Sequence, residues 1–113
     1  ARDLPDRARR LHEVNETDDE VTLCCLLWAH EGMGHELSAY EDDVLALLPQ
    51  HSGRVVQRAY GTGDDGAPDE IQLIHFDSAA GLDSFLADPH RVSLSARRDR
   101  AVRRTKTFPI RLR

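Results

Sequence analysis

The sequence predicts a single α+β domain whose strands and helices follow the order β-α-β-β-α-β. Short apolar stretches bounded by glycine, proline or acidic residues recur along the chain, and such stretches are typical of strands. Between them lie segments whose apolar residues are spaced three and four apart, which is typical of helices with one buried face. The length of 113 residues suits one domain with one modest core.

The first apolar stretch, residues 21–29, is the most informative segment. It is too short to span a membrane, which requires about 20 apolar residues. It is also too continuous for a strand with one wet face, so it predicts a strand over about 21–30 that is buried on both faces. Cys24 and Cys25 are neighbours there and point to opposite faces, so we interpret them as small core residues of a cytosolic protein.

An amphipathic helix is expected over residues 35–48. Its buried side carries apolar residues at spacings of three and four: Leu37, Tyr40, Val44, Leu47 and Leu48. Its wet side is expected to carry four acids: Glu36, Glu41, Asp42 and Asp43. Pro49 and Gly53 end the helix.

Two strands follow, over residues 54–60 and 70–76, joined by a loop rich in glycine and aspartate. The loop is not a phosphate-binding loop, because it lacks the lysine and hydroxyl residue that follow such a glycine. Its Asp64 and Asp65 would also repel phosphate.

The second helical segment is expected in two pieces that together reach Ala101. Asp77 or Ser78 can cap the first piece. Asp88 can cap the second piece, because Pro89 fits the first position of a helix.

A last strand is expected over residues 105–112, where Pro109 suggests an edge position. The order of elements predicts a ferredoxin-like fold for residues 21–113, a four-stranded antiparallel sheet with the helices on one face. Residues 1–20 are expected to form a charged N-terminal arm. Since the first and third strands are apolar on both sides, the second face of the sheet is expected to pack on a second copy of the chain.

Charge is distributed unevenly along the chain. Residues 97–113 carry eight basic residues and one acid, although the net charge of the whole chain is −5. We interpret this segment as a charged helix face followed by an edge strand whose arginine and lysine side chains oppose aggregation. Nucleic-acid binding is the weakest alternative. The basic residues are not interleaved with aromatic residues, and the sequence has no cysteine and histidine spacing typical of a zinc site. With no signal-peptide pattern and no membrane span in the sequence, a cytoplasmic location is expected.

Three segments carry a resemblance to a known superfamily: the apolar strand 21–29, the strand and cap at 71–78 (IQLIHFDS), and residues 85–90 (FLADPH). In these segments the chain resembles the dimeric α+β barrels, which include antibiotic-biosynthesis-monooxygenase, EthD-like and NIPSNAP-like families. The resemblance implies a homodimer that packs sheet to sheet, with a pocket in each protomer between the open sheet face and the helices. It also implies cofactor-free oxygenation, isomerisation or cyclisation of a small aromatic or polyketide-like metabolite.

His75 is the candidate catalytic residue. It is a titratable group near the end of an apolar strand, and its ordinary pKa near 6.5 suits proton transfer. The alternative is a hydrogen-bonded core or edge histidine.

Other polar and aromatic residues are candidate substrate-binding groups. Trp28 and His30 share one face of the first strand, where they could line the pocket mouth for a planar substrate. Arg58 and Tyr60 share a face of the second and could bind a carboxylate or phenolate. Two further candidates lie near the start of the first helix and the break in the second: Tyr40 and His90.

No metal and no cofactor are expected. A site built from His30, His35 and either His75 or His90 is conceivable, but the sequence has no histidine pair at helical i, i+4 spacing and no His-x-His. Two functions therefore stay open. The first is an enzyme, such as a cofactor-free monooxygenase or isomerase, and the second is a non-catalytic ligand-binding or assembly protein.

Overall fold

A computed structural model describes residues 20–113, so the predicted arm lies outside the described residues except for Glu20. The described chain forms four strands, four α-helices and two short 3-10 turns. In chain order they are β1 (Val21–Ala29), α2 (Gly34–Leu45), η1 (Leu48–His51), β2 (Gly53–Tyr60), η2 (Asp64–Gly66), β3 (Glu70–Phe76), α3 (Ala79–Leu86), α4 (Pro89–Ser93), α5 (Ser95–Ala101) and β4 (Val102–Pro109).

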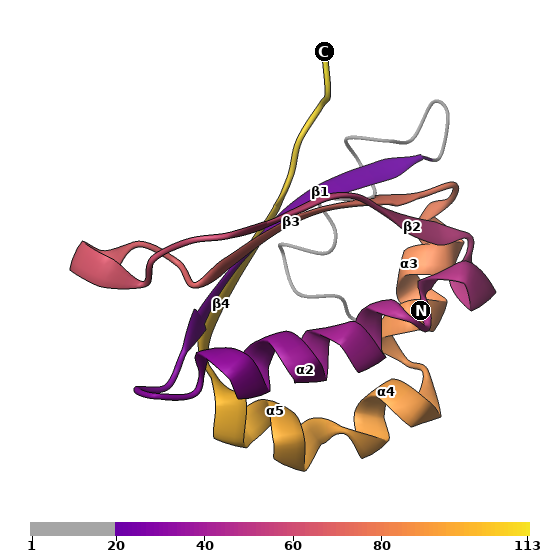
Figure 1. Ribbon diagram of the computed structural model, residues 1–113. Helices are drawn as coiled ribbons and strands as arrows, with labels where there is room; N and C mark the ends of the chain where they lie inside the picture. The colour runs from indigo at the N-terminus through magenta and orange to yellow at the C-terminus, as the bar shows by residue number, and fades with distance from the viewer. Residues whose placement is uncertain (1–19) are drawn as a thin grey trace.

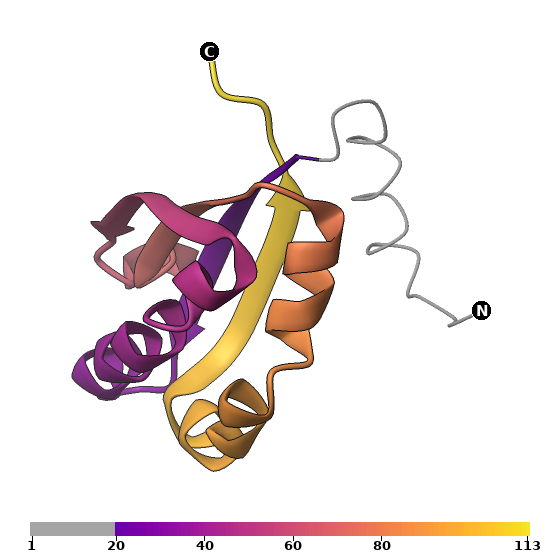
Figure 2. The same ribbon diagram turned by 90° about the vertical axis from the view of Figure 1, so that its right-hand side faces the viewer.

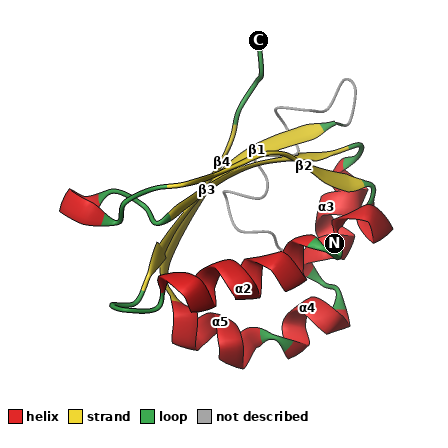
Figure 3. Cartoon of the chain, in the orientation of Figure 1, coloured by secondary structure: helices red, strands yellow, loops and turns green. Residues whose placement is uncertain are grey.

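The sheet confirms the predicted ferredoxin-like arrangement. Its strand order is β2-β3-β1-β4, and every neighbouring pair is antiparallel. The helices gather on one face of this sheet, as two views at right angles show (Figure 1, Figure 2). Figure 3 shows the same two layers coloured by secondary structure. We call the sheet face turned away from the helices the distal face.

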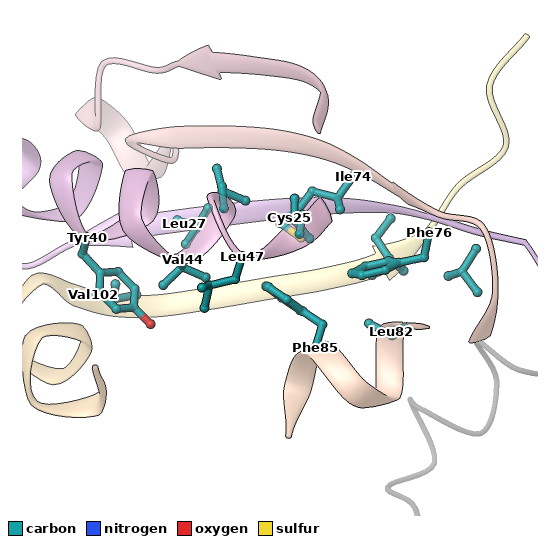
Figure 4. Packing of buried hydrophobic residues seen from close by; sticks show 14 of the residues in the cluster. Cys25, Leu27, Tyr40, Val44, Leu47, Ile74, Phe76, Leu82, Phe85 and Val102 are labelled. Atoms are coloured by element: carbon teal, nitrogen blue, oxygen red, sulfur yellow. The ribbon is translucent and has the colours of Figure 1, made fainter. Parts of the chain in front are cut away.

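The central strand β1 is apolar on both sides, as its sequence predicts. Val21, Leu23 and Leu27 are buried against the helices, in one cluster with residues of α2 and α3. Figure 4 shows Leu27 in this cluster beside Val44 of α2. On the distal face, Cys24 and Leu26 are half-buried. The hydrophobic core therefore lies between the sheet and the helices, and the distal face keeps an apolar strip.

Several expected boundaries are wrong by a few residues, including the end of the last strand, which is Pro109 rather than 112. Helix α2 ends at Leu45 rather than 48, and the turn η1, which contains Pro49, begins at Leu48. The second helical piece is interrupted at Leu94, which separates α4 from α5. Strand β4 begins at Val102 rather than 105, because an edge strand tolerates the exposed side chains of Arg103 and Arg104 that make its start look unlike a strand.

Both helix caps in this region match the expectation. The Ser78 hydroxyl accepts a hydrogen bond from the Gly81 N–H at 3.0 Å at the start of α3. The Asp88 carboxylate accepts one from the His90 N–H at 2.8 Å, with Pro89 at the first turn of α4. His51 also contacts Asp88 at 2.7 Å, which connects η1 to the start of α4.

Within residues 20–113, no helix has the length and apolar character that crossing a membrane requires.

Candidate functional site

A cavity of about 120 Å³ lies between the helix-covered face of the sheet and the helices. A cavity of about 150 Å³ binds benzene, so this somewhat smaller one suits a ligand no larger than about one ring. Most of its wall is apolar, with contributions from Leu23, Leu27, Val44, Ile74, Leu82 and Phe85. The polar side chains that line it include Tyr40, Glu41, Gln72, Arg91 and Arg98. Such an apolar pocket with a few convergent polar groups is the usual form of a small-molecule site.

Glu41 of α2 is the acidic group of this cavity. Its side chain is only 7% exposed, and its carboxylate accepts a hydrogen bond from the Gln72 amide at 2.8 Å. Burial raises the pKa of Glu41 above its ordinary value, and the nearby Glu70 carboxylate adds to this, although the Gln72 hydrogen bond opposes the shift. A carboxylate with a raised pKa is a stronger base, which suits it to proton transfer.

A chain of buried contacts connects Glu41 to the edge of the sheet. The Gln72 amide also donates to Glu70 at 2.6 Å, and Glu70 is 1% exposed. Arg58 donates to both oxygens of Glu70, from Nε at 2.8 Å and from Nη2 at 3.2 Å. Burial opposes the charged form of Arg58, but its hydrogen bonds to Glu70 and Asp42 outweigh this and raise its pKa. Arg58 therefore neutralises Glu70 and leaves Glu41 as the carboxyl group that faces the cavity.

Tyr40 lines the same cavity and is buried among apolar side chains (Figure 4). Burial raises the pKa of its hydroxyl, and the neighbouring Glu41 carboxylate adds to the shift, whereas Arg91 and Arg98 oppose it. Tyr40 is thus the predicted binding residue that the structure places next to the cavity's carboxyl group.

Arg91 of α4 contributes an unusual donor. Its guanidinium lies over the Phe85 ring, 5.2 Å from the ring centre, and Nη1 approaches the Leu86 carbonyl at 3.4 Å. Its Nε is buried and has no hydrogen-bond partner among residues 20–113. Buried donors are nearly always paired, so an unpaired one calls for an explanation.

Arg58 and Tyr60 share a strand face, as predicted, but they lie outside the cavity. The donors of Arg58 are engaged by protein carboxylates and by the Ser38 carbonyl. Tyr60 is 69% exposed and lines an open groove together with Ser38 and Asp69. Arg58 therefore does not line the cavity. It is connected to Glu41 only indirectly, through hydrogen bonds to Glu70 and from Gln72.

His75 lies on the distal face, on the opposite side of the sheet from the cavity. Its Nδ1 contacts the Thr22 hydroxyl at 2.8 Å, and its Nε2 lies 3.5 Å from carboxylate oxygens of both Glu20 and Asp77. Among the described residues these three form a group with the spacing of metal ligands, which His30, His35 and His90 do not join. The catalytic role of His75 stays a prediction that the cavity geometry does not support.

Trp28 is also on the distal face but far from His75. Its indole donates to the Gly66 carbonyl at 2.9 Å, and Arg104 covers the ring. The Thr22 partner of His75 lies six residues away along β1, which is about 20 Å. Trp28, Tyr60 and His75 therefore do not enclose one pocket within the chain.

The remaining predicted histidines lie at the surface. The ring of His30 contacts the Asp99 carbonyl at 3.1 Å, and His90 is exposed at the start of α4. Neither lines the cavity. Of the predicted binding residues, the structure thus brings Tyr40 to the cavity and leaves the others elsewhere.

The sequence interpretation missed Glu41 by assigning it to the wet side of its helix. The signal was present, because Glu41 lies four residues after Leu37 and four before Leu45, and both are buried. Gln72 was missed similarly, since it alternates with Ile74 and Phe76 on the helix-covered side of β3.

No family model matches the sequence, and no curated protein matches it. Similar solved structures do exist. A protein of unknown function from Rhodopseudomonas palustris has a TM-score of 0.70 at 17% identity, over 98% of this chain and 96% of that one. SnoaB, a cofactor-independent oxygenase from Streptomyces nogalater, has a TM-score of 0.62 at 17% identity, over 84% of this chain and 96% of that one.

A third similar structure is a dimeric protein of unknown function with a ferredoxin-like fold from Bacteroides fragilis. Its TM-score is 0.60 at 10% identity, over 83% of this chain and 97% of that one. NIPSNAP-like proteins are among the similar structures too. The resemblance seen in the sequence is therefore confirmed at the level of the fold: this chain has the ferredoxin-like architecture that a cofactor-independent oxygenase and NIPSNAP-like proteins also have.

Proposed function

We propose that the protein is a small-molecule enzyme that removes a proton from an acidic C–H group of a one-ring substrate held in the cavity. The single observation that carries the proposal is the buried Glu41 carboxyl group, which faces an apolar cavity and is held by Gln72. Glu41 takes the proton-transfer role that the sequence assigned to His75.

The proposed step is an enolisation. The C–H bond next to a carbonyl carbon breaks, the proton passes to the Glu41 carboxylate, and the electron pair moves into the substrate as an enolate. Oxygenation, isomerisation and cyclisation can all start from this intermediate, so it unites the reactions that the family resemblance implies. The apolar walls exclude water and orient the substrate, while Gln72 keeps the carboxylate in one orientation. The similarity to a cofactor-independent oxygenase supports a scaffold for such chemistry, though not a particular substrate.

Filling the cavity tests this proposal. In D₂O, the wild-type protein should catalyse deuterium exchange at the acidic C–H of a one-ring aryl ketone such as acetophenone, measured by proton NMR. Val44→Phe places a larger side chain in the wall and should abolish at least about 90% of the catalysed rate, because substrate and added ring compete for the same space.

The matched control is Ala46→Phe, at an exposed position just beyond α2, which should exchange like the wild type. Circular dichroism of both variants establishes that they are folded. No catalysed exchange with any aryl ketone, or full exchange by a folded Val44→Phe protein, would contradict the proposed function. Binding of the ketones without exchange would favour the ligand-binding alternative.

Self-association belongs to the same proposal. On the distal face, Leu26 lies opposite Ile71, and Cys24 lies opposite both Leu73 and Phe108 in the sheet register. These apolar side chains are half-buried in one chain, and a second copy packed sheet to sheet would cover them. The dimeric ferredoxin-like protein from Bacteroides fragilis supports this arrangement.

Light scattering at micromolar concentration should therefore give the mass of two chains. Leu26→Glu should shift the protein to one chain, because an unpaired charge at the centre of an apolar interface is strongly unfavourable. The control is Leu86→Glu at an exposed position of α3, which should remain dimeric. A monomeric wild-type protein would contradict the assembly.

A further inference from the structure

Arg91 has a buried donor for which residues 20–113 provide no acceptor. Its Nε is buried without a partner within residues 20–113, and Nη1 makes one long contact with the Leu86 carbonyl. The guanidinium lies over the Phe85 ring, 5.2 Å from its centre. A buried N–H that lacks an acceptor costs free energy, so a bound acceptor toward which the guanidinium turned would stabilise the protein.

The charges around the cavity favour an anion as that acceptor. Arg91 and Arg98 both line the cavity, and neither forms an ion pair in the described part of the chain. By contrast, Arg97 on the same helix as Arg98 is paired with Asp43 at the surface. The two carboxyl groups nearest the cavity are already engaged, Glu41 by Gln72 and Glu70 by Arg58 and Gln72. Among residues 20–113, the cavity wall thus carries two arginines without an ion-pair contact and one carboxyl group, Glu41, with which Arg91 interacts electrostatically, which leaves a positive charge in excess.

We propose that the ligand of this cavity carries a planar oxyanion, a carboxylate, phenolate or enolate, and that the Arg91 guanidinium binds it. The guanidinium edge is a rigid fork that matches two acceptor lone pairs. The apolar body of the ligand then lies against Phe85, Leu82 and Val44. This inference rests on the proposed function, because it places the developing enolate oxygen on Arg91 while Glu41 holds the proton.

A charge-matched pair of probes tests the inference. Benzoate and benzamide have almost the same shape, and calorimetry measures both dissociation constants for the wild-type protein. Benzoate should bind about 10- to 100-fold more tightly, because hydrogen bonds to a charged group are stronger than neutral ones. A second pair, 4-nitrophenolate and nitrobenzene, measures the preference for a phenolate and distinguishes phenolate binding from carboxylate binding.

The variants Arg91→Met and Arg97→Met separate the cavity arginine from a surface arginine on the neighbouring helix. Methionine keeps an unbranched side chain over Phe85, and thermal unfolding establishes that the variant is folded. Arg91→Met should remove the preference for both anions, whereas Arg97→Met should retain it. Equal affinity for the charged and neutral probes in the wild type, or an unchanged preference in Arg91→Met, would overturn the inference.

Failure of the anion site can be distinguished from failure of the proposed function. If deuterium exchange depends on the cavity but anions gain no affinity, the enolisation proposal stands and the anion site is wrong. If none of the probes binds and no ketone exchanges, both proposals fail together.

Discussion

Replacing Glu41 by glutamine is expected to lower the rate of catalysed deuterium exchange by a factor of about 10² to 10⁴, the range that a positioned general base contributes. Glutamine keeps the shape of the side chain and can still accept the Gln72 hydrogen bond through its amide oxygen. It has no carboxylate to receive a proton, so the loss should fall on the chemical step. Binding of the ketone, measured separately by NMR titration, should change little.

The control is Glu36→Gln, in the first turn of the same helix and exposed to solvent. It changes the net charge by the same amount and should leave the exchange rate unchanged. If Glu41→Gln exchanges as fast as Glu36→Gln, Glu41 is not the base. His75→Gln would then be the next variant to measure.

Glu41→Gln has a second readout, which is the pH dependence of the free energy of unfolding. The pKa of Glu41 is raised in the folded protein, so between its ordinary and its raised value the folded state holds a proton that the unfolded chain releases. The free energy of unfolding of the wild type should therefore fall relative to Glu41→Gln as pH rises through this window, and the difference should then stay constant. Urea unfolding across this range measures the difference, and a flat difference curve would contradict the buried environment of Glu41.

Arg58→Met is expected to lower the free energy of unfolding by about 3–5 kcal/mol, the usual cost of breaking a buried ion pair by removing one partner. Glu70 is almost fully buried, and Arg58 donates to both of its oxygens. Without Arg58, Glu70 would either remain charged beside Gln72 or take up a proton, and both cost free energy. The loss is large because a domain of this kind has a total stability of about 5–15 kcal/mol.

Urea unfolding, followed by the fluorescence of the single tryptophan, Trp28, measures this loss. Protein concentration must be held constant, because association would contribute to stability. Arg97→Met is the matched control, since its ion pair with Asp43 is exposed and should contribute about 0–1 kcal/mol. The double variant Arg58→Met with Glu70→Met should recover much of the loss. Similar losses for Arg58→Met and Arg97→Met would show that the buried pair is not a major source of stability.

The fold could be predicted because local patterns and global architecture agree. Residues 21–29 predict a strand buried on both faces, and the caps at Ser78 and Asp88 mark helix starts that the structure confirms. The start of β4 was missed because Arg103 and Arg104 are exposed on an edge strand. No alternation of apolar and polar residues marks the strand there.

The candidate site was harder to predict, because sequence patterns show which side of an element is buried but not which elements meet. Tyr40 was predicted and lies at the cavity, whereas Arg91 gave no signal. Its role depends on Phe85 from the preceding helix, over which its guanidinium lies. His75 and Tyr40, predicted separately as a catalytic and a substrate-binding residue, lie on opposite sides of the sheet.

The sequence by itself determined the order of the elements, the sheet and the apolar character of both its faces, because these follow from the spacing of apolar residues along the chain. Only the tertiary structure decided that Glu41 faces a cavity, that Gln72 holds it, and that the Arg91 Nε has no acceptor within residues 20–113. The physical reason is that burial and hydrogen bonding of a polar side chain depend on residues distant in sequence, such as Arg58 on β2 and Glu70 on β3.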